Sequence, residues 1–338
     1  EALVSGMNGT IRKVSVTGPI GKTVVCEYGV IENTDGKTGE KTEEKTAVIE
    51  IAKAAGLTLL SEEERNPLYT TTYGVGEVIK DAVRNGCRKF IVGIGGSATN
   101  DGGAGMLQAL GFGLLKENGE QIPIGARGLE ELAEITDDNV IPELAECKFK
   151  IACDVTNVLC GETGASAVYG PQKGADEEMT ERLDRLLFSY ASLVKKKIPK
   201  ADSMYPGTGA AGGLGFAFLT FMDAQLESGI QIVIKETGLE QEIAKADLVI
   251  TGEGRMDGQT AMGKAPIGIA KIAKKYGKPV IAFAGAAARD AGACNEQGID
   301  AFFPILREAV SLEAAMKREN AEANMEAAVE QAYRLWRL

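Results

Sequence analysis

Short apolar runs that end in glycines and alternate with helical patterns constrain the fold more than any other feature of this chain. One run, at 88–96, follows a helical pattern at 70–86 that ends at a glycine. Near the C-terminus, runs at 246–254 and 278–285 flank a helical pattern at 263–277. Buried strands that alternate with helices predict a parallel, doubly wound sheet, with ligands bound beyond the carboxyl ends of its strands.

The remaining segments have a different pattern. Residues 11–31 predict two strands around a turn at Gly18, and 116–235 combine a polar stretch with a basic helix at 177–200. We therefore expect an α/β protein in which a discontinuous Rossmann-like domain is interrupted by a second, inserted α/β domain. The predicted Rossmann-like domain comprises residues 66–115 and 236–338, and the second domain comprises residues 1–65 and 116–235.

Composition excludes several functions. The 338-residue chain has a formal net charge of −11, so we expect no nucleic-acid partner. It contains no His, which excludes Ser-His-Asp hydrolysis and His-based zinc sites and leaves acid–base work to carboxylates, Lys, Tyr or Cys. Its six cysteines form no CxxC pair and no apolar run reaches about 20 residues, so we expect a cytoplasmic protein without membrane association.

A glycine-rich loop follows the run at 88–96. Backbone N–H groups at Gly95, Gly96 and Ser97 are predicted to bind a phosphate or carboxylate, because glycine permits close approach to a ligand. Asp101 lies among the same glycines, where a carboxylate would repel a phosphate unless it binds Mg²⁺ or takes a proton. Close packing of strand and helix is the alternative explanation of these glycines.

Two further loops carry candidate residues. Asp154 follows the apolar run at 149–153, where a catalytic base or metal ligand would lie, although a turn or helix cap is the alternative. Lys173 lies between Gln172 and a glycine and is a candidate phosphate contact. The loop at 206–215 contributes Gly212 and Gly213 as predicted phosphate contacts, although its glycine spacing alone is a weak signal.

The loop after 246–254 alternates Glu253, Arg255 and Asp257. Arg255 can fork onto a carboxylate or phosphate, and the acids can hold magnesium, whereas a surface ion-pair cluster is the alternative. The nearby GQTAMGKA matches a P-loop only in part, because Ala265 replaces the Ser or Thr that holds Mg²⁺. Taken together, the loops offer the carboxylates, cations and N–H groups that phosphoryl transfer needs.

Four ordered segments resemble those of bacterial glycerate kinases of the glycerate and glucarate utilisation type. They are FIVGIGGSATNDGGAGMLQALG, CDVTNVLCGETGASAVYGPQKGA, GTGAAGGLGFAF and DLVITGEGRMDGQTAMGKAPIGIA. The resemblance implies a phosphotransferase that phosphorylates an alcohol group of D-glycerate with ATP, with 2-phosphoglycerate favoured as the product. Members of this family usually open with a further strand and helix, and we expect that segment to be absent from this sequence.

On this basis we assign candidate roles. The catalytic candidates are Asp101, Asp154 and Arg255, and the predicted metal ligands are Asp257 and Asp101. The predicted substrate or phosphate contacts are Gly95, Gly96, Ser97, Lys173, Gly212, Gly213 and Glu253. ATP and Mg²⁺ are the expected cofactors, glycerate the expected small-molecule partner, and a homodimer one arrangement that we consider. A nicotinamide-dependent dehydrogenase and a non-catalytic carboxylate-binding protein remain alternatives.

Overall fold

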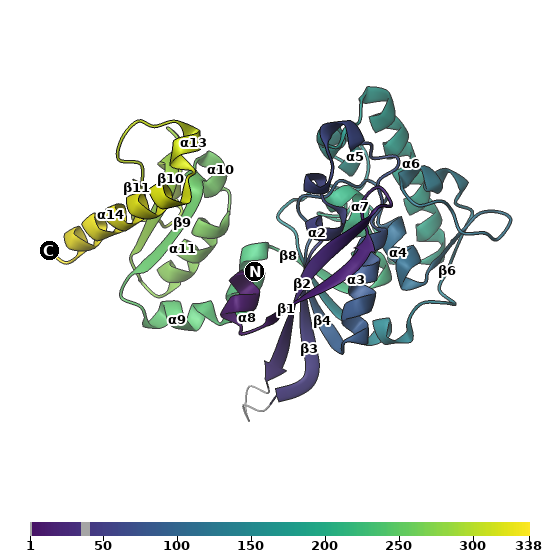
Figure 1. The fold of residues 1–338 in the computed structure, drawn as a ribbon, viewed down its shortest axis with the longest axis horizontal. Coiled ribbons are helices and arrows are strands. Elements are labelled where there is room, and N and C mark those ends of the chain that lie inside the picture. The colour runs from purple at the N-terminus through teal and green to yellow at the C-terminus, as the bar shows by residue number, and fades with distance from the viewer. Residues whose placement is uncertain (1, 35–40) are drawn as a thin grey trace. The chain divides into compact units, whose positions relative to one another are not determined.

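The computed structural model describes residues 2–34 and 41–338 and divides the chain into two compact units, residues 1–229 and 230–338 (Figure 1). The expected α/β class is confirmed. The division differs from the predicted one, because the strand at Cys87–Gly93 pairs with strands of the first unit on both sides. The segment 66–115 therefore lies in the first unit and does not join 236–338 in one sheet.

The first unit is built on a six-stranded sheet. Its order is β1 (Thr10–Thr17), β2 (Thr23–Thr34), β3 (Lys41–Glu50), β4 (Cys87–Gly93), β7 (Lys148–Ala152) and β8 (Asp223–Glu227). The pairs β1–β2 and β2–β3 are antiparallel, and the three pairs from β3 to β8 are parallel. The hairpin predicted around Gly18 is thus confirmed, and it extends a parallel sheet into a mixed one.

Helices and a small second sheet complete this unit. The α-helices are α1 (Ala2–Gly6), α2 (Ala52–Ala55), α3 (Tyr73–Arg84), α4 (Ala104–Leu110), α5 (Ala165–Tyr169), α6 (Glu177–Lys197) and α7 (Ala210–Phe221). Short 3₁₀ helices lie at Leu57–Leu59, Glu62–Glu64, Ala126–Glu131, Pro142–Glu146 and Pro171–Lys173. Strands β5 (Gly113–Leu115) and β6 (Glu134–Thr136) form an antiparallel pair.

Helix α3 shows how the sequence pattern produces packing. Its apolar residues recur at helical spacing and form one buried face, namely Val75, Val78, Ile79, Ala82 and Val83. The helix ends at Arg84, and Gly86 adopts the left-handed conformation (φ +85°) that commonly terminates a helix. Helix α3 packs on α4, β1 and β4, so the apolar face is buried against the sheet.

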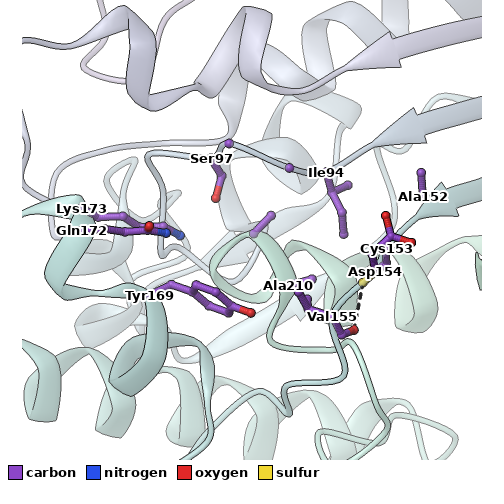
Figure 2. Close-up of a pocket in the computed structure, with 13 residues that line it drawn as sticks. Ile94, Ser97, Ala152, Cys153, Asp154, Val155, Tyr169, Gln172, Lys173 and Ala210 are labelled. Carbon is purple, nitrogen blue, oxygen red and sulfur yellow. Dashed lines mark hydrogen bonds between the residues drawn. The ribbon is translucent and has the colours of Figure 1, made fainter. Parts of the chain in front are cut away.

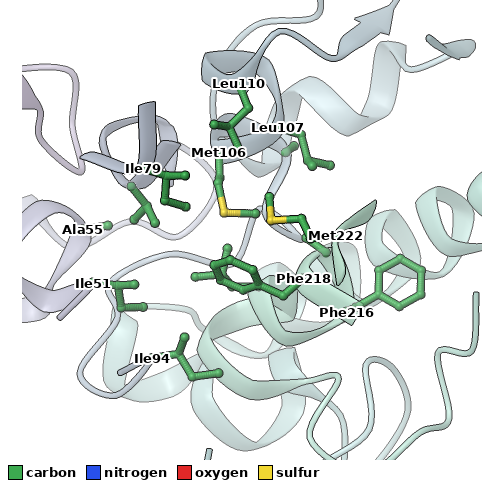
Figure 3. Packing of buried hydrophobic residues seen from close by; sticks show 14 of the residues in the cluster. Ile51, Ala55, Ile79, Ile94, Met106, Leu107, Leu110, Phe216, Phe218 and Met222 are labelled. Atoms are coloured by element: carbon green, nitrogen blue, oxygen red, sulfur yellow. The ribbon is translucent and has the colours of Figure 1, made fainter. Parts of the chain in front are cut away.

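Aromatic residues of neighbouring parallel strands and of α7 form part of the core of the first unit. Phe90 and Phe149 on neighbouring strands stack with ring centroids 4.6 Å apart, and Phe218 of α7 lies 5.7 Å from Phe149. Figure 3 shows Met106 of α4 and Met222 after α7 meeting beside Phe218 in this core. These contacts hold β4, β7 and α7 together, and the loops of the candidate site follow or precede these elements.

The second unit has a parallel three-stranded sheet of order β11 (Ala301–Pro304), β10 (Val280–Ala287), β9 (Val249–Met256). Its helices are α8 (Gly229–Thr237), α9 (Leu239–Lys245), α10 (Gly258–Ala261), α11 (Ala265–Lys275), α12 (Ala293–Glu296), α13 (Leu312–Ala315) and α14 (Arg318–Trp336). The predicted alternation of strands and helices is confirmed here. Within the described parts of the chain, no helix is both long enough and apolar enough to span a bilayer.

Candidate active site

The carboxyl ends of the parallel strands of the first unit lie in register. Glu50 of β3 pairs with Gly93 of β4, Gly93 with Ala152 of β7, and Ala152 with Glu227 of β8. The loops that follow these residues therefore begin side by side at one edge of the sheet. This edge is where ligands bind in open α/β folds.

A pocket of about 270 Å³ opens at this edge (Figure 2). Its walls come from four segments: the loop after β4, the loop after β7, the segment from α5 to the following 3₁₀ helix, and the start of α7. The lining residues are Ile94–Ser97, Ala152–Val155, Tyr169, Gln172, Lys173, Ala210 and Ala211. The structure thus brings together five predicted residues, namely Gly95, Gly96, Ser97, Asp154 and Lys173.

The loop after β4 presents backbone donors to the pocket. Gly95 and Gly96 are exposed, and Gly96 has a positive φ of +71°. The carbonyl of Gly96 accepts from Leu57 N after α2, and the N–H of Ala98 donates to the carbonyl of Ala55, the last residue of α2, so the loop is held in place. In the described parts of the chain, the N–H groups of Gly95, Gly96 and Ser97 donate to no protein acceptor. Such groups can bind an anion.

Lys173 is the buried cation of the pocket. It is 2% exposed, and its Nζ donates to the carbonyl oxygen of Thr99 at 2.6 Å. Burial lowers the pKa of this amine to about 7, and the negative charge of Asp101 opposes the decrease. In Figure 2, Lys173 and Gln172 extend side by side into the space between Ser97 and Tyr169.

Asp101 is fully buried and does not line the pocket. Its carboxylate is 0% exposed and accepts hydrogen bonds from Thr72 N (2.8 Å), Thr72 Oγ1 (2.9 Å), Gly103 N (3.1 Å) and Gly105 N (3.3 Å). Burial raises the pKa of Asp101, and the hydrogen bonds from Thr72, Gly105 and Gly103 oppose this rise. Both oxygens are thus occupied by donors, and the geometry supports neither the predicted proton acceptor nor the predicted metal ligand at this position.

The two glycine-rich loops pack against each other. Gly102 N donates to Gly212 O at 2.9 Å, and a Cβ on Gly213 would lie 2.8 Å from Gly102 Cα. Ala211, Gly212 and Gly213 are consecutive left-handed residues, with φ of 53°, 68° and 93°. The close-packing alternative thus applies to Gly212 and Gly213, which do not line the pocket, whereas the neighbouring Ala211 does.

Gly212→Ala is expected to destabilise the protein by about 2–5 kcal/mol. Alanine would be strained at φ +68°, and its Cβ would lie 2.0 Å from the Thr99 carbonyl oxygen that binds Lys173. Gly86→Ala is a matched control, because Gly86 has φ +85° but no atom within 4 Å of an added Cβ. Urea denaturation of both variants separates the effect of the steric contact from the effect of backbone strain. Equal losses in the free energy of unfolding would contradict the close packing at Gly212.

Asp154 forms the opposite side of the pocket from Lys173 (Figure 2). It is exposed, and its Oδ1 accepts hydrogen bonds from Ser228 Oγ at 2.8 Å and Gly229 N at 3.0 Å. No hydrogen bond to Oδ2 occurs among the described residues. The carboxylate is therefore held by one oxygen while the other is open to a ligand.

The fourth loop lies in the second unit. Asp257 caps α10: its Oδ1 accepts from Thr260 N at 3.1 Å, and Lys264 Nζ lies 3.7 Å away. The hydrogen bond from the Thr260 backbone is the main cause that lowers the pKa of Asp257, and Lys264 adds to it. Arg255 is exposed, and Glu253 Oε1 is buried and has no hydrogen-bond partner among the residues described. The roles predicted for these three residues stay predictions.

The sequence-based prediction missed part of the pocket. Tyr169 forms one wall, held by a 2.6 Å hydrogen bond from its hydroxyl to Asn157 Oδ1, and Gln172 is beside Lys173. Tyr169 and Gln172 flank the Gly-Pro pair that precedes Lys173. Their position next to a predicted ligand contact was the sequence signal that could have identified them. Val155 and Ala210 give no comparable signal.

Comparison with known proteins identifies the family. The model of the glycerate kinase family matches residues 1–337. The glycerate kinase of Halalkalibacterium halodurans is 47% identical over 94% of this chain and 81% of its own length, and the glycerate 2-kinase of Escherichia coli is 46% identical over the same shares. A crystal structure of a candidate glycerate kinase 2 from Salmonella typhimurium superposes with a TM-score of 0.83 at 45% identity, covering 98% of this chain and 84% of that one. The chain belongs to the glycerate kinase family.

Proposed function

We propose that this chain transfers the γ-phosphoryl group of ATP to D-glycerate, with 2-phosphoglycerate as the favoured product. The carrying observation is the pairing of a buried amine, Lys173, with an exposed carboxylate, Asp154, across one pocket at the strand ends. The Escherichia coli relative is named as a glycerate 2-kinase, which supports position 2. These relatives lend no support to the dehydrogenase or to the non-catalytic binding protein.

The pocket residues divide the work of phosphoryl transfer. Lys173 and the free N–H groups of Gly95 and Gly96 bind the glycerate carboxylate or a phosphate, which neutralises charge. The Oδ2 atom of Asp154 accepts the proton of the reacting hydroxyl. The hydroxyl oxygen then forms its bond to the γ-phosphorus while the bond from phosphorus to the ADP oxygen breaks.

Magnesium fits this donor set as a companion of the nucleotide. No cluster of three or more metal-binding side chains occurs among residues 2–34 and 41–338. Mg²⁺ is commonly held by one or two carboxylates together with substrate phosphates and water, so single open carboxylates suffice. Asp257 stays the predicted metal ligand, and the ion would neutralise phosphate charge. Arg255 and Glu253 stay predicted contacts of the phosphates, and the cytoplasmic location and a homodimer also stay predictions.

A coupled ADP-release assay tests this function. D-Glycerate should support turnover with ATP and Mg²⁺, L-glycerate and lactate should support it poorly, and EDTA should abolish it. Phosphorus NMR of the product distinguishes 2-phosphoglycerate from 3-phosphoglycerate. Turnover that persists in EDTA would contradict the role of Mg²⁺, and no ADP release with D-glycerate would contradict the function.

A further inference from the structure

The amine of Lys173 has fewer acceptors than it has donors. A lysine ammonium has three N–H donors, and the Thr99 carbonyl oxygen at 2.6 Å is its one acceptor among the described residues. Thr99 Oγ1 is also buried and has no hydrogen-bond partner in the part of the chain that the structure describes. Since Lys173 is 2% exposed and lines the pocket, the missing acceptors must come from water or from a bound ligand.

The charged and titratable groups that act on Lys173 or line the pocket with it come from three segments. Asp101, after β4, is the charge that acts on the amine through space, and no ion pair within 4 Å joins the two in the described structure. Two other titratable groups, Tyr169 at the end of α5 and Asp154 after β7, line the pocket together with Lys173. Every partner of the Asp101 carboxylate donates a hydrogen bond, which is the arrangement that an ionised carboxylate requires.

A buried amine of this kind changes its protonation when an anion arrives. Burial lowers the pKa of Lys173 to about 7, so in the empty pocket much of the amine is uncharged above neutral pH. A carboxylate beside the amine would favour the ammonium form and supply one of its missing acceptors. The amine should therefore take a proton from solvent as the anion binds.

We propose that the pocket binds its anionic substrate together with a proton, which Lys173 takes up, and that Asp101 is a positioning residue that sets the pH range of this uptake. The proposal rests on the proposed function, because glycerate supplies the anion. The balance is simple: a carboxylate, a neutral amine and one solvent proton give an ammonium–carboxylate pair, and no covalent bond to carbon or phosphorus changes.

Isothermal titration calorimetry with D-glycerate tests the proposal without turnover. Titrations at pH 8 in buffers with different enthalpies of ionisation give the number of protons taken up per glycerate bound. We expect more than half a proton at pH 8 and much less at pH 6. Binding without proton uptake at pH 8 would overturn the proposal alone, whereas no glycerate binding at any pH would overturn the proposed function and the proposal with it.

Variants assign the proton to Lys173. Lys173→Met should eliminate the uptake, and Lys173→Arg, which keeps a permanent charge, should bind glycerate without uptake. Lys196→Met, at an exposed position of α6, is the matched control and should keep the uptake. Asp101→Asn should move the uptake to lower pH, because the charge that favours the ammonium form is lost. Unchanged uptake in either Lys173 variant would overturn the proposal.

Discussion

Lys173→Met is expected to remove at least about 99% of the kinase activity while the protein becomes more stable at acidic pH. Methionine has a similar length and fills the same space, so the packing around position 173 is kept. The variant loses a buried charged contact to the substrate, which typically costs about 2–5 kcal/mol and lowers kcat/KM by at least about 10²-fold near the middle of that range. Kinetics and urea denaturation should be measured on the same preparation.

The stability effect follows from the pKa of Lys173. The folded-state pKa of about 7 lies below the ordinary value of 10.5, so the unfolded chain binds more protons between these pH values. The contribution of Lys173 to the free energy of unfolding is therefore fully present above about pH 10.5 and is lost as pH falls toward 7. Methionine does not titrate, so its advantage should be largest below pH 7 and should shrink as pH rises.

Two measurements decide whether burial of the charged Lys173 amine lowers the stability of the fold. At pH 6 the loss of the burial penalty should outweigh the cost of leaving the Thr99 carbonyl oxygen without its donor, about 1–3 kcal/mol. Lys196→Met should show no such dependence on pH between 6 and 9. A Lys173→Met variant that is less stable at pH 6 would mean that the bond to Thr99 stabilises the fold more than burial of the amine costs.

Local structure was predictable from the sequence because it depends on neighbouring residues. The apolar spacing of Val75, Val78 and Val83 predicted the buried face of α3, and the apolar run at 88–96 predicted β4. The division into units was not predictable in this way. The division depends on which strands pair with one another. Strand β4 pairs with β3 and β7, which lie up to about 60 residues away in the sequence, and no local sequence pattern indicates this pairing.

The site shows the same limit at the level of single residues. Gly95, Gly96 and Lys173 were predicted as ligand contacts, and all three line one pocket, the glycines in the loop after β4 and Lys173 in the 3₁₀ helix after α5. Asp101 was predicted as a catalytic residue or metal ligand of the same glycine-rich loop, but it is fully buried. Its partner Thr72 lies 29 residues earlier, and only the packing of α3 beside α4 shows that the carboxylate is enclosed.

Asp154→Asn and Asp101→Asn are expected to have opposite consequences. Asp154→Asn should lower turnover by about 10²–10⁴-fold, the usual scale for loss of a general base. Its free energy of unfolding should change little, because the amide oxygen can still accept from Ser228 Oγ and Gly229 N at an exposed position. Ser228→Ala is the control, since it removes one hydrogen bond and leaves the carboxylate, and it should keep most of the activity.

Asp101→Asn should instead destabilise the protein, by about 2–4 kcal/mol. An asparagine amide has one acceptor oxygen, so its NH₂ group must replace one of the two carboxylate oxygens. In place of Oδ2 it would face the donors Thr72 N and Gly105 N, and in place of Oδ1 it would face the donor Gly103 N. The variant should melt several degrees earlier but retain turnover with a shifted pH profile at temperatures where circular dichroism shows it folded. If Asp101→Asn melts normally and loses turnover while Asp154→Asn retains it, the two roles are reversed: Asp101 is then the base, and the enclosed geometry opens during the catalytic cycle.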